Sequence, residues 1–128
     1  MGAQRIKPTE SELEILQILW QHGSATVRFV NDQLNMKKKV GYTTTLKIMQ
    51  IMAQKGLLNR EKQGKSHIYI SVIKEKETQS VLLDKLLDTA FGGSAMNLVM
   101  QALGNHKTSK EEIKKIKAFI EQLEGDQK

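Results

Sequence analysis

Three consecutive threonines follow Tyr42 at the start of a segment, residues 42–55, whose later apolar residues recur at helical spacing. Threonine is a mediocre helix former, so three of them in one turn indicate a role beyond helix formation. The N–H groups of a first helical turn are unpaired and favour phosphate, while threonine adds a hydroxyl for phosphate or a base edge and a methyl group for thymine. The pattern therefore indicates nucleic-acid contact.

The outward face of the same segment is polar and carries no acidic residue. At about 100° per residue, an inward face of Thr45, Ile48, Met49 and Met52 leaves an outer stripe of Thr43, Lys47, Gln50 and Gln54. We predict contacts to base edges, or to the phosphates beside them, for Thr43, Thr44 and Lys47, with Gln50 as a further candidate.

Four other residues are predicted to position the protein on a nucleic-acid backbone: Arg28, Tyr42, Arg60 and Lys65. An alternative interpretation is that the threonines only cap and fill the helix start and that these cations are solvated surface charges. The run Lys37–Lys39 is interpreted as a solvated loop that raises the general positive field.

The net charge of +6 is confined to one half of the chain. Residues 1–73 hold 11 Lys or Arg against 5 Asp or Glu, whereas residues 74–128 hold 9 against 9. A polyanion facing the first half is the simplest explanation, and nucleic acid is favoured over an anionic membrane because the basic residues are dispersed.

Several classes of chemistry are excluded by composition and spacing. The chain has no cysteine, and its three histidines, His22, His67 and His106, lack a partner at metal-ligand spacing. No nucleophile with a nearby base and no glycine-rich phosphate loop is present, so we predict neither an enzyme nor a bound cofactor or metal. No window approaches the roughly 18 apolar residues of a membrane span, and we expect a cytoplasmic protein.

The elements that must position these residues can be read from periodicity, caps and glycines. A capping box from Thr9 to Glu12 starts a helix over 9–22 that Gly23 ends, and a second helix over 27–35 precedes the segment 42–55. Residues 57–62 and 66–72 predict a hairpin, in which Ile68, Ile70 and Val72 alternate with His67, Tyr69 and Ser71. Three helices followed by a hairpin is the order of a winged helix-turn-helix domain, predicted here over residues 1–73.

The second half predicts helices over about 76–91 and about 94–103 and, after Gly104, a last helix started by a capping box from Thr108 to Glu111. Their apolar faces exceed what a segment of 55 residues could bury alone, so residues 74–128 are predicted to form a helical dimerisation domain. The interface candidates are Leu83, Leu86, Leu87, Phe91, Val99, Ile113, Ile116, Ile120 and Leu123. The fold class is thus mainly α with a small β-hairpin wing.

Several stretches resemble the penicillinase repressor (BlaI/MecI) family of bacterial transcriptional regulators. They are the segment Glu12–Trp20, Tyr42-Thr-Thr44, Gln54-Lys-Gly-Leu-Leu58, and Phe91-Gly-Gly93 followed by Leu98-Val99. The resemblance covers about residues 6 to 124 and is carried by the order and spacing of these stretches. It implies a winged-helix domain joined to a helical dimerisation domain, which binds as a homodimer to a palindromic operator with TACA and TGTA half-sites and represses downstream genes.

The resemblance also implies a switch. In antibiotic-responsive members, a membrane sensor-protease system induces the genes by causing a cut within the helix that follows the Phe-Gly-Gly stretch. Those members carry an Asn-Phe bond where this chain carries Gln101-Ala102, which is the candidate position of a proteolytic switch. Copper-responsive relatives carry cysteine pairs near the C-terminus, and that mode of induction is excluded here because the chain has no cysteine.

A winged-helix adaptor that binds protein instead of DNA is the main rival. The polar outer stripe favours DNA, since a protein interface would need an aromatic or aliphatic anchor there. Repression itself rests on the resemblance alone, and an activator or an architectural protein is left open by the residues.

Overall fold

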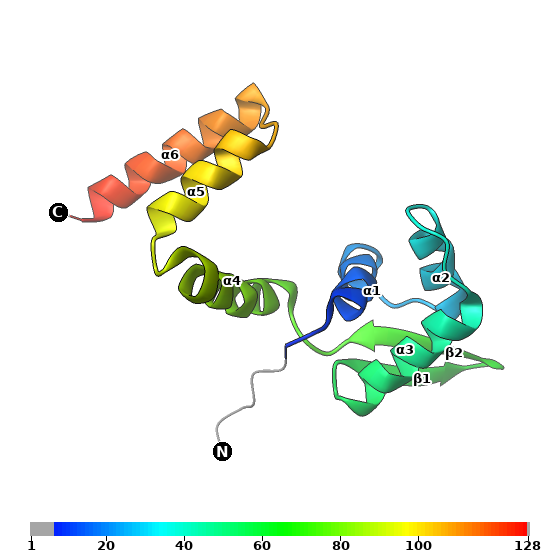
Figure 1. Cartoon of the computed structure of the whole chain (residues 1–128). Helices are drawn as coiled ribbons and strands as arrows, with labels where there is room; N and C mark the ends of the chain where they lie inside the picture. The colour runs from blue at the N-terminus through cyan, green and yellow to red at the C-terminus, as the bar shows by residue number, and fades with distance from the viewer. Residues whose placement is uncertain (1–6, 128) are drawn as a thin grey trace, which may run out of the picture. The chain divides into compact units, whose positions relative to one another are not determined.

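The computed structural model describes residues 7–127, and its elements follow the predicted order of three helices, a hairpin and three helices (Figure 1). The first five elements are α1 Glu10–His22, α2 Val27–Asn35, α3 Tyr42–Gln54, β1 Leu58–Gln63 and β2 Ser66–Ser71. They are followed by α4 Glu75–Phe91, α5 Ala95–Asn105 and α6 Lys110–Asp126. The prediction of a mainly helical chain with a β-hairpin wing is confirmed.

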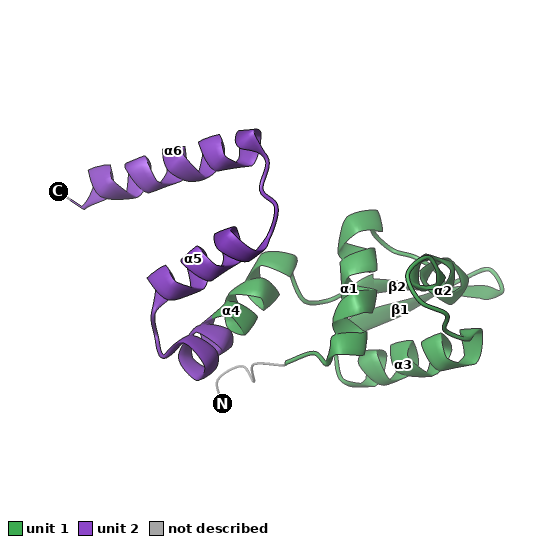
Figure 2. Ribbon diagram, turned by 45° about the horizontal axis from the view of Figure 1, so that its top comes forward, with its two compact units in different colours: residues 1–83 green, residues 84–128 purple. Residues whose placement is uncertain are grey.

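The chain divides into two compact units, residues 1–83 and 84–128, called unit 1 and unit 2 below (Figure 2). Helix α4 begins in unit 1 and ends in unit 2. A domain boundary at residues 73/74 stays a prediction. Among residues 7–127, no helix is long and apolar enough to cross a membrane.

The core of unit 1 is built by α1, α2, α3 and the hairpin. Its fully buried apolar side chains are Ile15, Leu16, Val30, Met49, Met52, Leu57, Leu58 and Tyr69. The strands pair antiparallel, from Leu58 opposite Ser71 to Gln63 opposite Ser66. The segment between α1 and α2 joins the sheet edge, because the N–H groups of Ala25 and Tyr69 donate to each other's carbonyls at 3.0 and 2.8 Å. This pairing fixes the hairpin to the helices.

The alternation of β2 is present, and its inner face is the one that carries Tyr69. The Tyr69 side chain is 1% exposed, whereas Ile70 and Val72 point outward and are 44% and 48% exposed. A tyrosine ring supplies a large apolar area to the core. The sequence pattern gave the period of the strand without showing which face is buried.

Capping decides where α1 and α6 begin. At α1 the predicted box is confirmed, with the Glu12 N–H donating to Thr9 Oγ1 at 3.2 Å and the Thr9 N–H donating to Glu12 Oε1 at 2.9 Å. The predicted box from Thr108 to Glu111 is wrong by one residue, because Ser109 caps α6 and Glu112 reciprocates. Two hydroxyl residues followed three positions later by two glutamates fit the motif in either register.

The predicted end of α5 at residue 103 is also wrong. Helix α5 continues through Gly104 to Asn105, and Gly104 is absent from the glycines with positive φ. A glycine costs about 1 kcal/mol relative to alanine inside a helix, which the rest of α5 tolerates.

An ion pair joins the start of α1 to the end of α3. Glu12 is 4% exposed, and its carboxylate accepts hydrogen bonds from Lys55 Nζ at 2.7 and 2.9 Å. Burial opposes ionisation of Glu12, but the hydrogen bonds from Lys55 and from the Thr9 backbone, with the charge of Lys55, outweigh it and lower the pKa of Glu12. The folded protein therefore favours the ionised carboxylate.

The stability of unit 1 should depend on the ionisation of Glu12. Because its pKa is lowered on folding, its contribution is complete above the ordinary value of 4.5 and is lost as the pH falls through the lower folded value. We expect Glu12→Gln to cost about 1–3 kcal/mol of unfolding free energy at pH 7, and less in acid.

Urea unfolding followed by the fluorescence of Trp20, the only tryptophan, measures this dependence. Glu14→Gln is the matched control, since Glu14 is exposed on the same helix. A Glu12→Gln deficit that persists unchanged into strong acid would contradict the assignment.

Candidate nucleic-acid interface

The buried and the exposed face of α3 are the ones that helical periodicity predicts. Thr45, Met49 and Met52 are buried in unit 1 and Ile48 is half-buried. The outer stripe, defined as Thr43, Lys47, Gln50 and Gln54, is exposed together with Thr44. A polar helix face with one cation and no carboxylate is thus offered to the surroundings along the length of α3.

The N-terminus of α3 is open. Its N-cap is Gly41, which provides no side-chain cap, whereas α1, α2, α5 and α6 are each capped by a threonine or serine hydroxyl. The first-turn N–H groups of a helix carry partial positive charge and hydrogen-bond well to phosphate oxygens. The three threonines therefore do not cap α3, and their predicted contact with nucleic acid stays a prediction.

A buried asparagine fixes the start of α3 to α2. Asn31 is 8% exposed, and its Nδ2 donates to Thr45 Oγ1 at 2.8 Å and to the Val40 carbonyl at 3.1 Å. Thr45 Oγ1 in turn donates to the carbonyl of Gly41 at 3.3 Å. Thr45 is consequently a structural residue, and the orientation of Thr43 and Thr44 follows from this contact.

Asn35 completes the turn between α2 and α3. Its Nδ2 donates to the Val40 carbonyl and to the Asn31 carbonyl, both at 2.8 Å, and its Oδ1 accepts from the Val40 N–H at 3.1 Å. We call Asn31, Asn35, Val40 and Thr45 the asparagine clamp. The contacts of Asn31 and Asn35 with Val40 and Thr45 join α2 to the turn and to α3, so the clamp holds α2 and α3 in one geometry.

Three of the four predicted backbone contacts meet in one hollow. The Arg28 guanidinium carbon lies 5.1 Å from the centroid of the Tyr42 ring, an arrangement that suits cation–π attraction. Arg28 from α2, Tyr42 from α3 and Lys65 from the hairpin tip line a hollow of about 330 Å³, called the basic hollow below. Two cations and a phenol hydroxyl beside the open end of α3 are suited to hold a phosphate.

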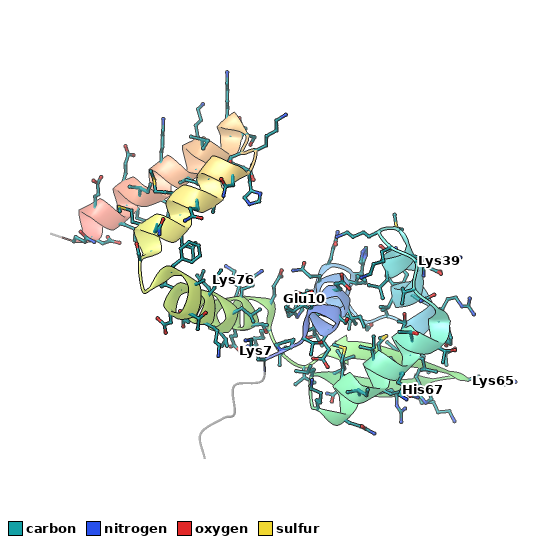
Figure 3. All side chains as sticks on the ribbon, viewed as in Figure 1. Lys7, Glu10, Lys39, Lys65, His67 and Lys76 are labelled. Carbon is teal, nitrogen blue, oxygen red and sulfur yellow. The ribbon has the colours of Figure 1, made fainter. Side chains whose placement is uncertain are left out.

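Sequence reasoning missed three polar residues of the basic hollow: Thr26, Ser66 and His67. Figure 3 labels His67 and Lys65 together at the hairpin. The signal for Ser66 and His67 was their position directly after Lys65 at the hairpin tip. Thr26 gave a weaker signal, because a threonine directly before a helix is already explained by capping. In the structure its hydroxyl does accept from the Phe29 N–H at 3.1 Å and caps α2.

Arg60 lies apart from the basic hollow. It is exposed on β1 opposite Tyr69, and it does not line the hollow that contains Arg28, Tyr42 and Lys65. Its predicted contact with a nucleic-acid backbone stays a prediction. Lys37–Lys39 are exposed in the turn between α2 and α3, where Figure 3 labels Lys39.

Unit 2 leaves a large apolar surface uncovered. No residue of α5 or α6 is buried, and five of the predicted interface residues are exposed: Leu83, the last residue of unit 1, and Leu86, Val99, Ile120 and Leu123 of unit 2. The other four are half-buried: Leu87, Phe91, Ile113 and Ile116. Three apolar residues outside that candidate set, Met96, Met100 and Phe119, are exposed as well. Gln101 and Ala102 are exposed within α5.

A family model described as penicillinase repressor matches residues 8–122. The chain belongs to the penicillinase repressor family. It is 25% identical over 120 residues to the penicillinase repressor of Bacillus licheniformis, covering 94% of each chain. It is 20% identical over 112 residues to the methicillin resistance regulatory protein MecI of Staphylococcus aureus, covering 88% of this chain and 91% of that protein.

The fold has a counterpart outside the penicillinase repressor family. A MarR family protein from Bacillus stearothermophilus superposes with a TM-score of 0.52 and 19% sequence identity. The match covers 95% of this chain and 76% of that chain. The likeness shows the arrangement of the fold, and the family match extends over the α3 region, the basic hollow and almost all of unit 2.

Removing the asparagine clamp should loosen the start of α3. We expect Asn31→Ala to lower the unfolding free energy of unit 1 by about 1–3 kcal/mol, because the buried Thr45 hydroxyl loses its donor and the Val40 carbonyl keeps only the one from Asn35. The amide of Thr45 should exchange hydrogen faster than in the wild type, which hydrogen-exchange NMR measures.

Asp32→Ala is the matched control, since Asp32 is the exposed neighbour on the same helix. If Asn31→Ala left the stability and the exchange of Thr45 as they are in Asp32→Ala, the clamp would not hold α3.

Proposed function

We propose that this protein is a transcriptional repressor that binds DNA as a homodimer on a palindromic operator and performs no catalysis. The observation that carries the proposal is the convergence of three features on the start of α3: the open N-terminus, the exposed outer stripe and the basic hollow. Membership of the penicillinase repressor family supports repression as the outcome of binding.

Helix α3 is proposed to enter the major groove. A B-DNA major groove admits one helix, and the side chains on its exposed face then meet base edges. Thr43, Thr44 and Lys47 would contact bases, with Gln50 one turn further along the groove. Lysine suits guanine O6 and N7, glutamine suits adenine, and the threonine methyls suit thymine.

The basic hollow is proposed to hold the DNA backbone beside that groove. Arg28 and Lys65 supply charge to phosphate oxygens, and Tyr42 both orients Arg28 and offers its hydroxyl. Arg60 would extend these contacts along the wing. Phosphate contacts fix the register of the protein without carrying sequence information, so they set which bases α3 meets.

Dimerisation through unit 2 is proposed because α4, α5 and α6 expose apolar side chains that water disfavours. A symmetric pair of chains would cover them and place two copies of α3 on two half-sites. A cut between Gln101 and Ala102 would separate the last turn of α5 and all of α6 from the rest of the chain. A sensor-protease system making that cut would weaken dimer contacts and release the operator, because two linked half-site contacts would become single ones.

Operator binding tests the proposal. The affinity of the purified protein should be on the order of 10³-fold higher for a duplex with a TACA/TGTA palindrome than for a scrambled duplex, and should fall steeply between about 50 and 200 mM salt. Fluorescence anisotropy with labelled duplexes measures both. Equal, weak binding to the two duplexes would contradict the proposal and favour the protein-binding adaptor.

Disrupting unit 2 should produce monomers. We expect Leu86→Asp with Ile116→Asp to shift the protein to the monomer in sedimentation equilibrium, because charges would be buried unpaired in the dimer contact. Lys85→Asp with Gln122→Asp is the control, since it adds acidic residues at exposed polar positions of the same helices. An unchanged dimer with intact helicity in the first variant would refute this interface.

A further inference from the structure

Unit 1 has a second hollow on the other side of the α3 N-terminus, with a volume of about 550 Å³. We call it the apolar groove. It lies between α1, the end of α2, the turn between α2 and α3, and the first turns of α3. Its apolar lining is Ile15, Ile18, Leu34, Met36, Val40 and Ile48.

The apolar lining of the groove is partly open to solvent, although Ile15 itself is buried in the core of unit 1. Ile18, Leu34 and Ile48 are half-buried, and Met36 is 77% exposed. Small-molecule sites are concave, mostly apolar and about 300–1,000 Å³ in volume, with a few polar groups that orient the ligand. The apolar groove fits this description in size, and most of its exposed lining area is apolar, although ten of its sixteen lining residues are polar.

Lys37, Lys38 and Lys39 form one edge of the apolar groove. Within residues 7–127 the structure has a single salt bridge, between Glu12 and Lys55, so these three lysines are unpaired there. Glu14 lines the α1 side of the groove but makes no ion pair with them. The edge therefore offers three ammonium groups to an anion.

We propose that the apolar groove binds a small amphipathic carboxylic acid and that this ligand weakens DNA binding. An apolar body of about eight carbons would lie along Ile18, Leu34 and Ile48, in keeping with a groove of this size. The carboxylate would meet the ammonium groups of Lys37–Lys39. A DNA phosphate would fit the lysines but would leave the apolar lining uncovered.

The effect on DNA follows from the position of the groove. Thr44, an exposed residue at the start of α3, also lines it, as does Val40 of the asparagine clamp. A bound carboxylate would place a negative charge beside the proposed DNA-facing helix and neutralise part of the basic turn. By thermodynamic linkage, operator DNA would weaken ligand binding by the same factor. The effect of the ligand on DNA binding rests on the proposed function, whereas binding of the ligand in the apolar groove does not.

Octanoate, below the concentration at which it forms micelles, is the probe for binding of a carboxylic acid in the apolar groove. Calorimetry of the full-length protein without DNA should show saturable binding, and methyl NMR should place the shift changes at Ile18, Leu34 and Ile48. Octanol, which has a similar apolar body and no charge, should bind more weakly. Absence of saturable binding, or shift changes confined to unit 2 methyls, would overturn the assignment.

Two variants that lose the same charge at different places distinguish a direct contact of octanoate with Lys37–Lys39 from an effect of net charge on octanoate binding. The triple variant Lys37→Gln, Lys38→Gln, Lys39→Gln should bind octanoate about fivefold more weakly, since each exposed charge contributes modestly. The matched variant Lys114→Gln, Lys115→Gln, Lys117→Gln loses the same charge from α6 and should bind as the wild type does. Equal loss in the two variants would overturn the carboxylate contact.

The effect of the ligand on DNA binding is tested by measuring operator affinity at increasing concentrations of octanoate. Wild-type affinity for the palindrome should fall as octanoate saturates its site, and octanol at the same occupancy should have a smaller effect. Unchanged affinity with octanoate bound would overturn the coupling. Operator affinity without octanoate tests the proposed function separately, so the two failures are distinguishable.

Discussion

The hydrogen bond from the Asn31 side chain to Thr45 is the contact on which the interface depends. A buried amide is costly unless its donors are satisfied, and here it is satisfied only when α3 begins at its observed place beside α2. That placement sets the distance between Arg28 on α2 and Tyr42 on α3, and so the shape of the basic hollow. At the other end of α3, the Glu12–Lys55 ion pair ties the helix to α1. Helix α3 is thus held at both ends.

The two hollows on either side of the α3 start divide the chemistry of unit 1. The basic hollow is polar and is proposed to position DNA, whereas the apolar groove has an apolar floor and a lysine edge. The apolar groove is lined by residues of the α2–α3 turn, and the basic hollow is lined by Tyr42, which directly follows that turn. The asparagine clamp holds the turn. A ligand on one side of the turn can therefore influence the other side through charge, without a long-range conformational change.

Periodicity and composition predicted what depends on neighbours in sequence. The faces of α3, the capping box at Thr9 and the order of the elements follow from spacings of a few residues, and all agree with the structure. Contacts between distant segments were not predictable, because the sequence does not show that Asn31 reaches Thr45 or that His67 joins Arg28. The start of α6 was missed for a different reason: two adjacent registers satisfied the same motif.

The outer stripe is proposed to contact bases and the basic hollow to contact phosphates, and two variants test this difference. Lys47→Ala should reduce affinity for the palindrome by about 10-fold or more while changing affinity for scrambled DNA little, because a base contact discriminates. Arg28→Ala should weaken binding to both duplexes by a similar factor, because a phosphate contact does not. Titration of both variants against both duplexes at one salt concentration gives the four affinities. Equal losses for Lys47→Ala on the two duplexes, or a selective loss for Arg28→Ala, would contradict the account.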